Sequence, residues 1–160
     1  MRFTHENRYA ASPDDVVAML TDQGYRSSLK SRTRSAAHSV RITEEGGSTV
    51  VVVDQKLRTS GIPSFAKKLV GDTIQLVQRE EWGGHEASFE LSIPGKPGHM
   101  RGTVNVVADG DGAVERVSGE AKASLPLVGG KIEKLLVDLI TQSLEREQAK
   151  GAAWLDGDRG

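Results

Sequence analysis

The longest regular pattern of apolar and polar residues lies near the C-terminal end of the chain, between Pro126 and Leu155. Apolar residues recur there at steps of three and four, so they share one face of a helix. Pro126 fits a first helical turn, where an N–H is not needed, and Gly151 is interpreted as the stop that lets Trp154 and Leu155 fold back as an apolar plug. We predict one long amphipathic helix, whose buried face contains Val128, Ile132, Leu135, Leu136, Leu139, Ile140 and Leu144.

Most of the chain before this helix alternates between apolar and polar residues, which is the two-residue period of a half-buried strand. Turn signals separate the alternating segments at 44–47, 83–84 and 109–112. Such short strands, joined by tight turns, are typical of an antiparallel sheet. We predict strands over 2–9, 37–43, 48–58, 73–82, 87–93, 100–106 and 116–123.

Three short helical segments interrupt the strands. Ser12 can cap a helix that starts at Pro13, and the aspartates after it favour the positive end of the helix dipole. A second short helix is predicted over 25–29, followed by a basic, solvated loop over 30–34. A third is predicted over 63–69, between two strands of the sheet.

The element order resembles the helix-grip fold of the START-like superfamily (polyketide cyclase and lipid transport proteins, SRPBCC). The segments Phe3–Glu6, Ser12–Val16 and Met19–Asp22 resemble its opening, and Leu125–Glu133 resembles a subfamily of unknown function common in actinobacteria. The resemblance implies an α+β fold with a curved antiparallel sheet wrapped around the long C-terminal helix and an apolar cavity between them. It spans nearly the whole chain, so we expect a single domain over 1–155 and a flexible tail over 156–160.

Composition narrows the classes of function. Lys plus Arg is 21 and Asp plus Glu is 22, and a net charge of −1 argues against a general nucleic-acid binder. The absence of Cys excludes disulfides, thiolate metal sites and Cys nucleophiles. No stretch reaches the roughly 18 apolar residues of a membrane span, and the first residues form no apolar signal segment. We expect a cytoplasmic protein without an integral membrane segment.

The common chemical motifs are absent. The four histidines lie on separate segments without the spacing of a metal-binding pair, so no metal site is predicted. Gly129-Gly130 lacks the remaining residues of a phosphate-binding loop, and a packing role is preferred for it. Asp109–Gly112 lacks the ligand spacing of a calcium loop and is interpreted as a hairpin turn. No cofactor is predicted.

One group of polar residues shares a strand face with apolar ones. Gln78, Glu80 and Trp82 follow Ile74 and Leu76 on the same side of the 73–82 strand. Because a buried polar group without a partner costs roughly 1–3 kcal/mol, these residues should pair with each other, with water or with a ligand. The competing interpretation places Glu80 at a solvent-exposed rim. The predicted ligand-binding residues are Gln78, Glu80, Trp82, Phe89, Leu91, Leu135, Leu136, Leu139 and Ile140.

Three functional hypotheses follow. The first is a binding protein for a small hydrophobic or amphipathic molecule, lipid-like or polyketide-like. The second is an enzyme that cyclises or dehydrates a polyketide-like substrate, with Glu80 or His5 as general acid or base. The third is a partner-binding protein with a filled core, using Lys67-Lys68 and the exposed face of the last helix. The sequence identifies neither the ligand nor the oligomeric state.

Overall fold

The computed structural model describes residues 1–158, which form seven strands and four helices. The strands are β1 (Arg2–Tyr9), β2 (Ser35–Glu45), β3 (Ser48–Arg58), β4 (Thr73–Gly83), β5 (Glu86–Ser92), β6 (His99–Asp109) and β7 (Gly112–Lys122). The helices are α1 (Pro13–Leu20), α2 (Gln23–Ser28), α3 (Ser64–Val70) and α4 (Gly129–Leu155). The predicted element order and α+β class are therefore confirmed.

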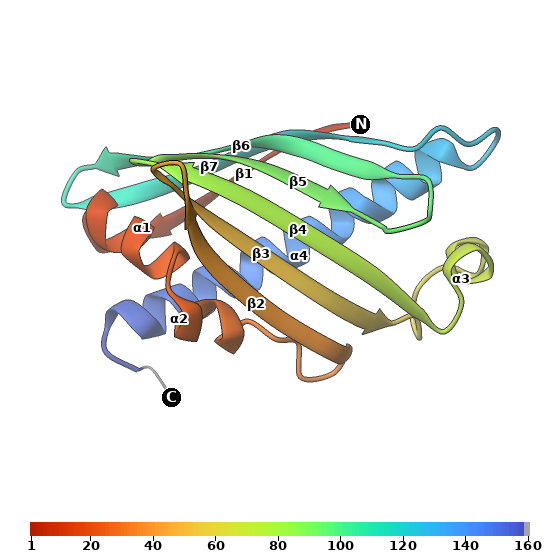
Figure 1. Cartoon of the computed structure of the whole chain (residues 1–160), viewed down its shortest axis with the longest axis horizontal. Helices are drawn as coiled ribbons and strands as arrows, with labels where there is room; N and C mark the ends of the chain where they lie inside the picture. The colour runs from red at the N-terminus through yellow and green to blue at the C-terminus, as the bar shows by residue number, and fades with distance from the viewer. Residues whose placement is uncertain (159–160) are drawn as a thin grey trace.

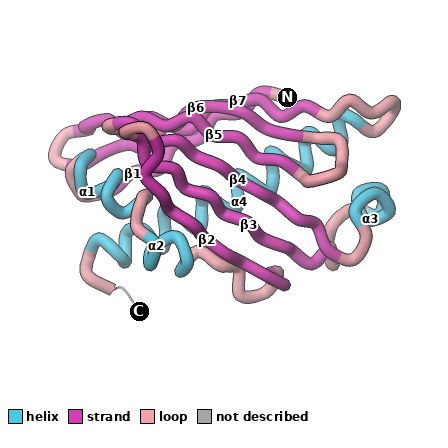
Figure 2. Tube along the Cα trace, viewed as in Figure 1, coloured by secondary structure: helices cyan, strands magenta, loops and turns pink. Residues whose placement is uncertain are grey.

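The strands form one antiparallel sheet in the order β1-β7-β6-β5-β4-β3-β2. The sheet curves around α4, which runs along its concave side (Figure 1). Figure 2 shows α1 and α2 beside the C-terminal half of α4, with α3 near the opposite end of the sheet. This arrangement is the helix-grip fold, and it leaves the space between sheet and α4 as the interior of the molecule.

The strand register brings the predicted inward residues into rows across the sheet. Val51, Glu80 and Phe89 lie opposite one another on β3, β4 and β5. Val53, Gln78 and Leu91 form the next row. Because directly opposed residues point to the same face, Gln78 and Glu80 on β4 each have apolar neighbours on both sides.

Local capping sets the ends of the first two helices. Ser12 accepts a hydrogen bond from the Asp15 N–H over 3.1 Å, and Pro13 occupies the first turn, as predicted. Asp22 Oδ1 accepts from the Tyr25 N–H over 2.8 Å, so α2 begins at Gln23. The helix predicted over 25–29 is therefore corrected to Gln23–Ser28, since the prediction missed the cap at Asp22.

The predicted bounds of the last helix need two corrections. It begins at Gly129 and not at Pro126, because Leu127 has a φ of 68°, a left-handed conformation that a helix cannot continue through. Gly151 is a buried residue inside α4 and not its stop. A Cβ there would lie 2.7 Å from Tyr9 Cε1, so the missing side chain lets α4 pack closely against β1.

The predicted apolar plug is also corrected, since Trp154 stays within α4. Its ring packs edge-on against Tyr25, with 5.5 Å between ring centroids. This contact fixes α2 against the C-terminal end of α4. The tail predicted to begin at residue 156 starts with a turn after Leu155, and residues 159–160 lie outside the described part of the chain.

Glycines in the middle of the sheet make room for two phenylalanines. Gly102 on β6 and Gly119 on β7 lie opposite each other, and a Cβ on either would lie within 3.1 Å of the Phe89 ring. Phe3 and Phe89 meet above them edge to face, with ring centroids 6.5 Å apart. The packing role predicted for Gly129-Gly130 holds for Gly129, since its Cβ would lie 2.5 Å from the Ala123 carbonyl oxygen, but not for Gly130, where a Cβ would meet nothing within 4 Å.

Candidate functional site

Glu80 lies at the centre of a buried polar cluster between the sheet and the helices. Its Oε1 accepts hydrogen bonds from Arg26 Nη2 and, over 2.8 Å, from Trp82 Nε1. Its Oε2 accepts from Gln78 Nε2 over 2.6 Å. Glu80 is only 3% exposed, so the interpretation that placed it at a solvent-exposed rim is wrong. Both of its oxygens are already occupied as acceptors.

Arg26 completes this cluster from α2. Its Nε donates to the Leu20 carbonyl over 2.7 Å, and its side chain is 5% exposed. Burial is the largest single effect and lowers the pKa of Arg26, but the charges of Glu80, Glu147 and Glu115 together outweigh burial and raise that pKa. The Arg26–Glu80 pair is therefore a buried, hydrogen-bonded ion pair that ties α2 to the middle of β4.

A second buried cluster lies beside the first. The carboxyl groups of Glu115 on β7 and Glu147 on α4 hydrogen-bond to each other. Asn7 Nδ2 donates to Glu115 over 3.3 Å and to the Leu144 carbonyl over 2.9 Å. Tyr9 donates to Glu115 over 3.4 Å. These contacts join β1, β7 and α4 in a region without access to bulk water.

Burial raises the pKa of both carboxyl groups in this cluster. Desolvation is the main cause for Glu147, and the nearby charge of Glu115 adds to it, so its pKa is raised well above the ordinary value. Glu147 Oε1 has no hydrogen-bond partner among the described residues. A hydrogen bond between two carboxyl groups needs a proton on one of them, so the pair holds a proton at a pH where exposed carboxyl groups are ionised.

Three small cavities follow one another through the space between sheet and α4. The mouth cavity, of about 30 Å³, is lined by Ser31, Arg34, Gln55, Leu57, Leu76, Gln78, Leu91, Leu139, Ile140, Gln142, Ser143 and Arg146. A side cavity of about 30 Å³ lies towards β2, between His38, Val53 and Leu29. A deep cavity of about 20 Å³ reaches Glu80, Glu115 and Glu147. Gln78 and Ile140 line all three. Each holds about one water molecule, so the interior is nearly filled by side chains.

The predicted site residues divide between these cavities. Gln78, Leu91, Leu139 and Ile140 line the mouth cavity, and Glu80 and Phe89 line the deep one together with Gln78 and Ile140. Trp82, Leu135 and Leu136 line none of the three. Leu136 is fully buried in the core, whereas Leu135, which was predicted to be buried, is half-buried at its edge.

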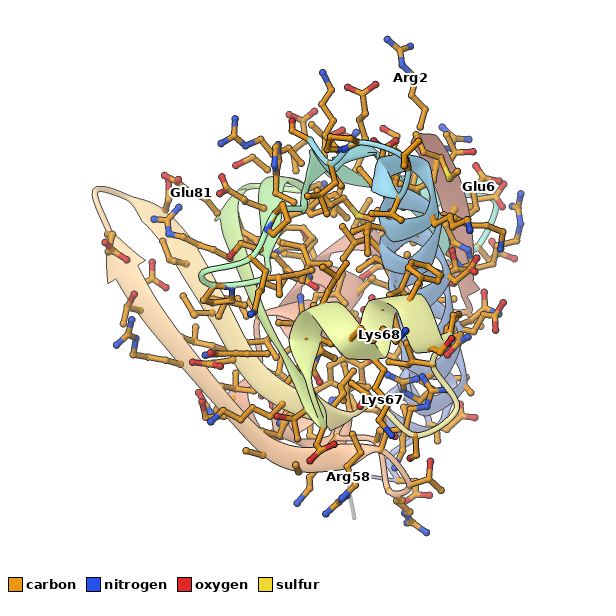
Figure 3. All side chains as sticks on the ribbon, turned by 90° about the vertical axis from the view of Figure 1, so that its right-hand side faces the viewer. Arg2, Glu6, Arg58, Lys67, Lys68 and Glu81 are labelled. Carbon is orange, nitrogen blue, oxygen red and sulfur yellow. The ribbon has the colours of Figure 1, made fainter. Side chains whose placement is uncertain are left out.

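His5 lies apart from these cavities. Its Nε2 is 2.7 Å from Asn7 Oδ1, so it belongs to the outer part of the Glu115 cluster. Lys67 and Lys68 are exposed on α3, which crosses in front of the other elements when the molecule is viewed from that end (Figure 3). Within residues 1–158, no three His, Asp or Glu side chains gather closely enough to hold a metal ion.

Sequence reasoning missed Arg26, Glu115 and Glu147. Glu115 lies two residues before Val117, so both side chains point to the same face of the strand. Glu147 follows Leu144 by three residues and so lies on the buried face of the helix. Both signals were readable from the periodicity. Arg26 lies on a six-residue helix, too short for a period to reveal its buried face.

The family described as "Protein of unknown function (DUF2505)" matches residues 4–155. No curated protein matches the chain. None of the described helices is long and apolar enough to cross a membrane.

Several solved structures share the fold at low sequence identity. A START superfamily protein from Mycobacterium smegmatis is 12% identical with a TM-score of 0.64, and the match covers 96% of this chain and 98% of that one. TTHA0849 from Thermus thermophilus is 18% identical with a TM-score of 0.62, over 94% and 93% of the two chains. The di-domain ARO/CYC StfQ from the steffimycin biosynthetic pathway is 13% identical with a TM-score of 0.64, over 95% of this chain and 50% of that one.

Proposed function

Since the chain belongs to the family of proteins of unknown function DUF2505 and has the START-like helix-grip fold, we propose that it binds a small hydrophobic or amphipathic molecule between the sheet and α4. The observation that carries this proposal is the run of three adjoining cavities, whose linings combine apolar side chains with a comparable number of polar and charged ones. A lipid-like or polyketide-like ligand is the class that such a lining suits.

The lining offers hydrogen-bonding capacity that the described protein leaves unused. Gln78 donates to Glu80, but no described residue donates to its carbonyl oxygen. Gln55 and Ser143 make no side-chain hydrogen bond within residues 1–158, and both line the mouth cavity. These groups can fix the orientation of a ligand whose apolar part is buried against Leu57, Leu91 and Ile140.

The small cavity volumes set a condition on binding. A ligand larger than a few atoms must displace side chains or move α4 away from the sheet. The mouth lies between α4 and the 29–34 loop, and that loop has few apolar residues to hold it in place. Binding therefore draws its free energy from apolar burial, at roughly 25 cal/mol per Å², less the cost of opening the interior.

A blocking variant tests this proposal. Ser143 is half-buried at the mouth, whereas Glu145 is exposed on the same helix, so Ser143→Trp and Glu145→Trp make a matched pair. We expect wild type and Glu145→Trp to bind the neutral apolar dye Nile red, and Ser143→Trp to bind it at least about tenfold more weakly, equivalent to about 1.4 kcal/mol. Equal binding by all three proteins, or none by wild type, would contradict an internal site. Native mass spectrometry of protein from its own host then identifies a retained ligand.

Proton-transfer catalysis is a second candidate function, favoured by the proton held between Glu115 and Glu147 beside the deep cavity. A protonated carboxyl group in a dry site suits general acid catalysis on a carbonyl substrate. The test follows deuterium exchange at the carbon between the carbonyls of a phenyl-substituted β-diketone. We expect Glu147→Gln to lose the acceleration that wild type gives, and equal exchange rates would exclude this role.

A further inference from the structure

A group of basic side chains surrounds the mouth cavity. Arg34 and Arg146 line the cavity itself. An open groove next to it is lined by Lys30, Arg32 and Lys150, and Arg146 lies in both. Neither lining contains an Asp or Glu side chain. The chain as a whole has a net charge of −1, so this positive charge is a local feature of the mouth.

These basic residues differ from most other arginines in lacking an acidic partner. Arg8, Arg26, Arg101 and Arg116 each lie within 4 Å of a carboxylate oxygen. Among residues 1–158, none of the five basic side chains around the mouth forms an ion pair. Unpaired cations held close together repel one another. An anion bound between these basic side chains would lower their electrostatic energy.

Arg146 belongs both to the basic group and to the lining of the cavities. It lines the mouth cavity, the side cavity and the outer groove. Its Nε is buried and has no hydrogen-bond partner among the described residues. Burial lowers the pKa of Arg146, and the charge of Arg34 lowers it further, so two guanidinium groups lie near each other in a partly dry site.

From this geometry we infer that the ligand of the mouth cavity is an amphipathic anion, with its oxyanion on Arg34 and Arg146 and its apolar part directed inwards past Leu139 and Ile140. This inference rests on the proposed binding function. Guanidinium groups bind carboxylate and phosphate oxygens through paired, charge-assisted hydrogen bonds, so both headgroups fit the same two residues. Lys30 and Lys150 in the outer groove attract the anion as point charges and do not require a particular orientation of its oxygens.

Matched ligands that differ only in headgroup test the inference. Dodecanoate, dodecyl phosphate and dodecanol are titrated against protein loaded with Nile red, below their micelle-forming concentrations. We expect both anions to displace the dye at least about tenfold more effectively than dodecanol, as charge-assisted hydrogen bonds require. The ratio of dodecanoate to dodecyl phosphate separates a carboxylate ligand from a phosphate one.

Variants of the mouth residues test whether Arg34 and Arg146 cause the preference for anions. We expect the advantage of the anions over dodecanol to disappear in the double variant Arg34→Gln/Arg146→Gln. Arg41→Gln is the matched control, because Arg41 is exposed on β2 and also lacks an ion pair among the described residues. It should leave the headgroup preference unchanged. Raising the ionic strength on wild type should reduce the preference without any substitution.

The outcomes separate the two proposals. If dodecanol and the anions bind equally well to wild type, the inference fails while the internal binding site stands. If none of the three binds, the proposed function fails as well. If the anions bind but keep their advantage in the double variant, the oxyanion site lies elsewhere and the assignment to Arg34 and Arg146 is overturned.

Discussion

Substituting Gly151 with Ala tests the close packing of α4 against the rest of the molecule. In an open helix position this change is stabilising by about 1 kcal/mol, because alanine loses less backbone entropy on folding. At Gly151 the new Cβ would lie 2.7 Å from Tyr9 Cε1, 3.0 Å from Met19 Cε and 3.2 Å from the Tyr25 hydroxyl. Two ring systems and a methionine must therefore shift.

The expected magnitude combines opposing effects. Overpacking in a filled core costs about 1–3 kcal/mol. Moving Tyr25 weakens the hydrogen bond that its hydroxyl donates to the Glu147 carbonyl over 2.8 Å, at about 0.5–1.5 kcal/mol. After the stabilisation of about 1 kcal/mol from the helix propensity of alanine is subtracted, Gly151→Ala should lower the free energy of unfolding by about 1–3 kcal/mol.

Urea unfolding followed by circular dichroism measures this loss. Gly130→Ala is the matched control, because Gly130 lies in the same helix and a Cβ there meets nothing within 4 Å. We expect this control to be neutral or up to about 1 kcal/mol more stable than wild type. If Gly151→Ala is as stable as wild type or more so, the described packing of α4 against β1 and α2 is wrong.

Three further predictions concern the interior. Leu139→Ala should lower the free energy of unfolding by about 2 kcal/mol, because the Leu139 side chain borders the mouth cavity. Leu136 is fully enclosed, so Leu136→Ala should lower it by about 5 kcal/mol. Equal losses for the two variants in urea unfolding would argue against a cavity beside Leu139. The raised pKa of Glu147 means that the folded state holds a proton that the unfolded state releases. The stabilisation is therefore present at acidic pH and is lost as the pH rises above the ordinary carboxyl range. The free energy of unfolding should fall by at most about 1.4 kcal/mol per pH unit for this one proton. Glu147→Gln should flatten that part of the stability profile, and an unchanged slope would show that Glu147 does not hold the proton. Arg26→Met should cost about 3–5 kcal/mol by leaving Glu80 buried without its cation, and the double variant with Glu80→Gln should recover part of the loss on thermal or urea unfolding.

Most of the fold was predictable from periodicity alone. The predicted strand 2–9 agrees with β1, where buried and exposed residues alternate along the strand. The predicted strand 48–58 agrees with β3, where the run of β-branched residues Val50–Val53 favours a strand. The end of α4 was mispredicted for a physical reason. Gly151 has the propensity of a helix stop, but tertiary packing against Tyr9 overrides that propensity.

The candidate site was less predictable, since it depends on contacts between distant segments. That Gln78 and Glu80 face inwards followed from the pattern of β4. Their partner Arg26 lies 54 residues from Glu80, and no local pattern relates the two. The mouth cations come from the 29–34 loop and from α4, and the loop was interpreted from composition as solvated only. Their convergence on one cavity depends on the tertiary fold.

The pairing of β1 with β7 has a consequence for how the molecule folds during synthesis. The first strand remains without a partner until residues 112–122 have been made, and its inner face stays uncovered until α4 follows. Contacts of such sequence separation slow folding, and an incomplete sheet exposes unpaired edges that associate with other chains. Ribosome-bound chains that end before α4 should therefore depend on chaperones that shield apolar surface, and release of the last helix is the step that frees the molecule from them.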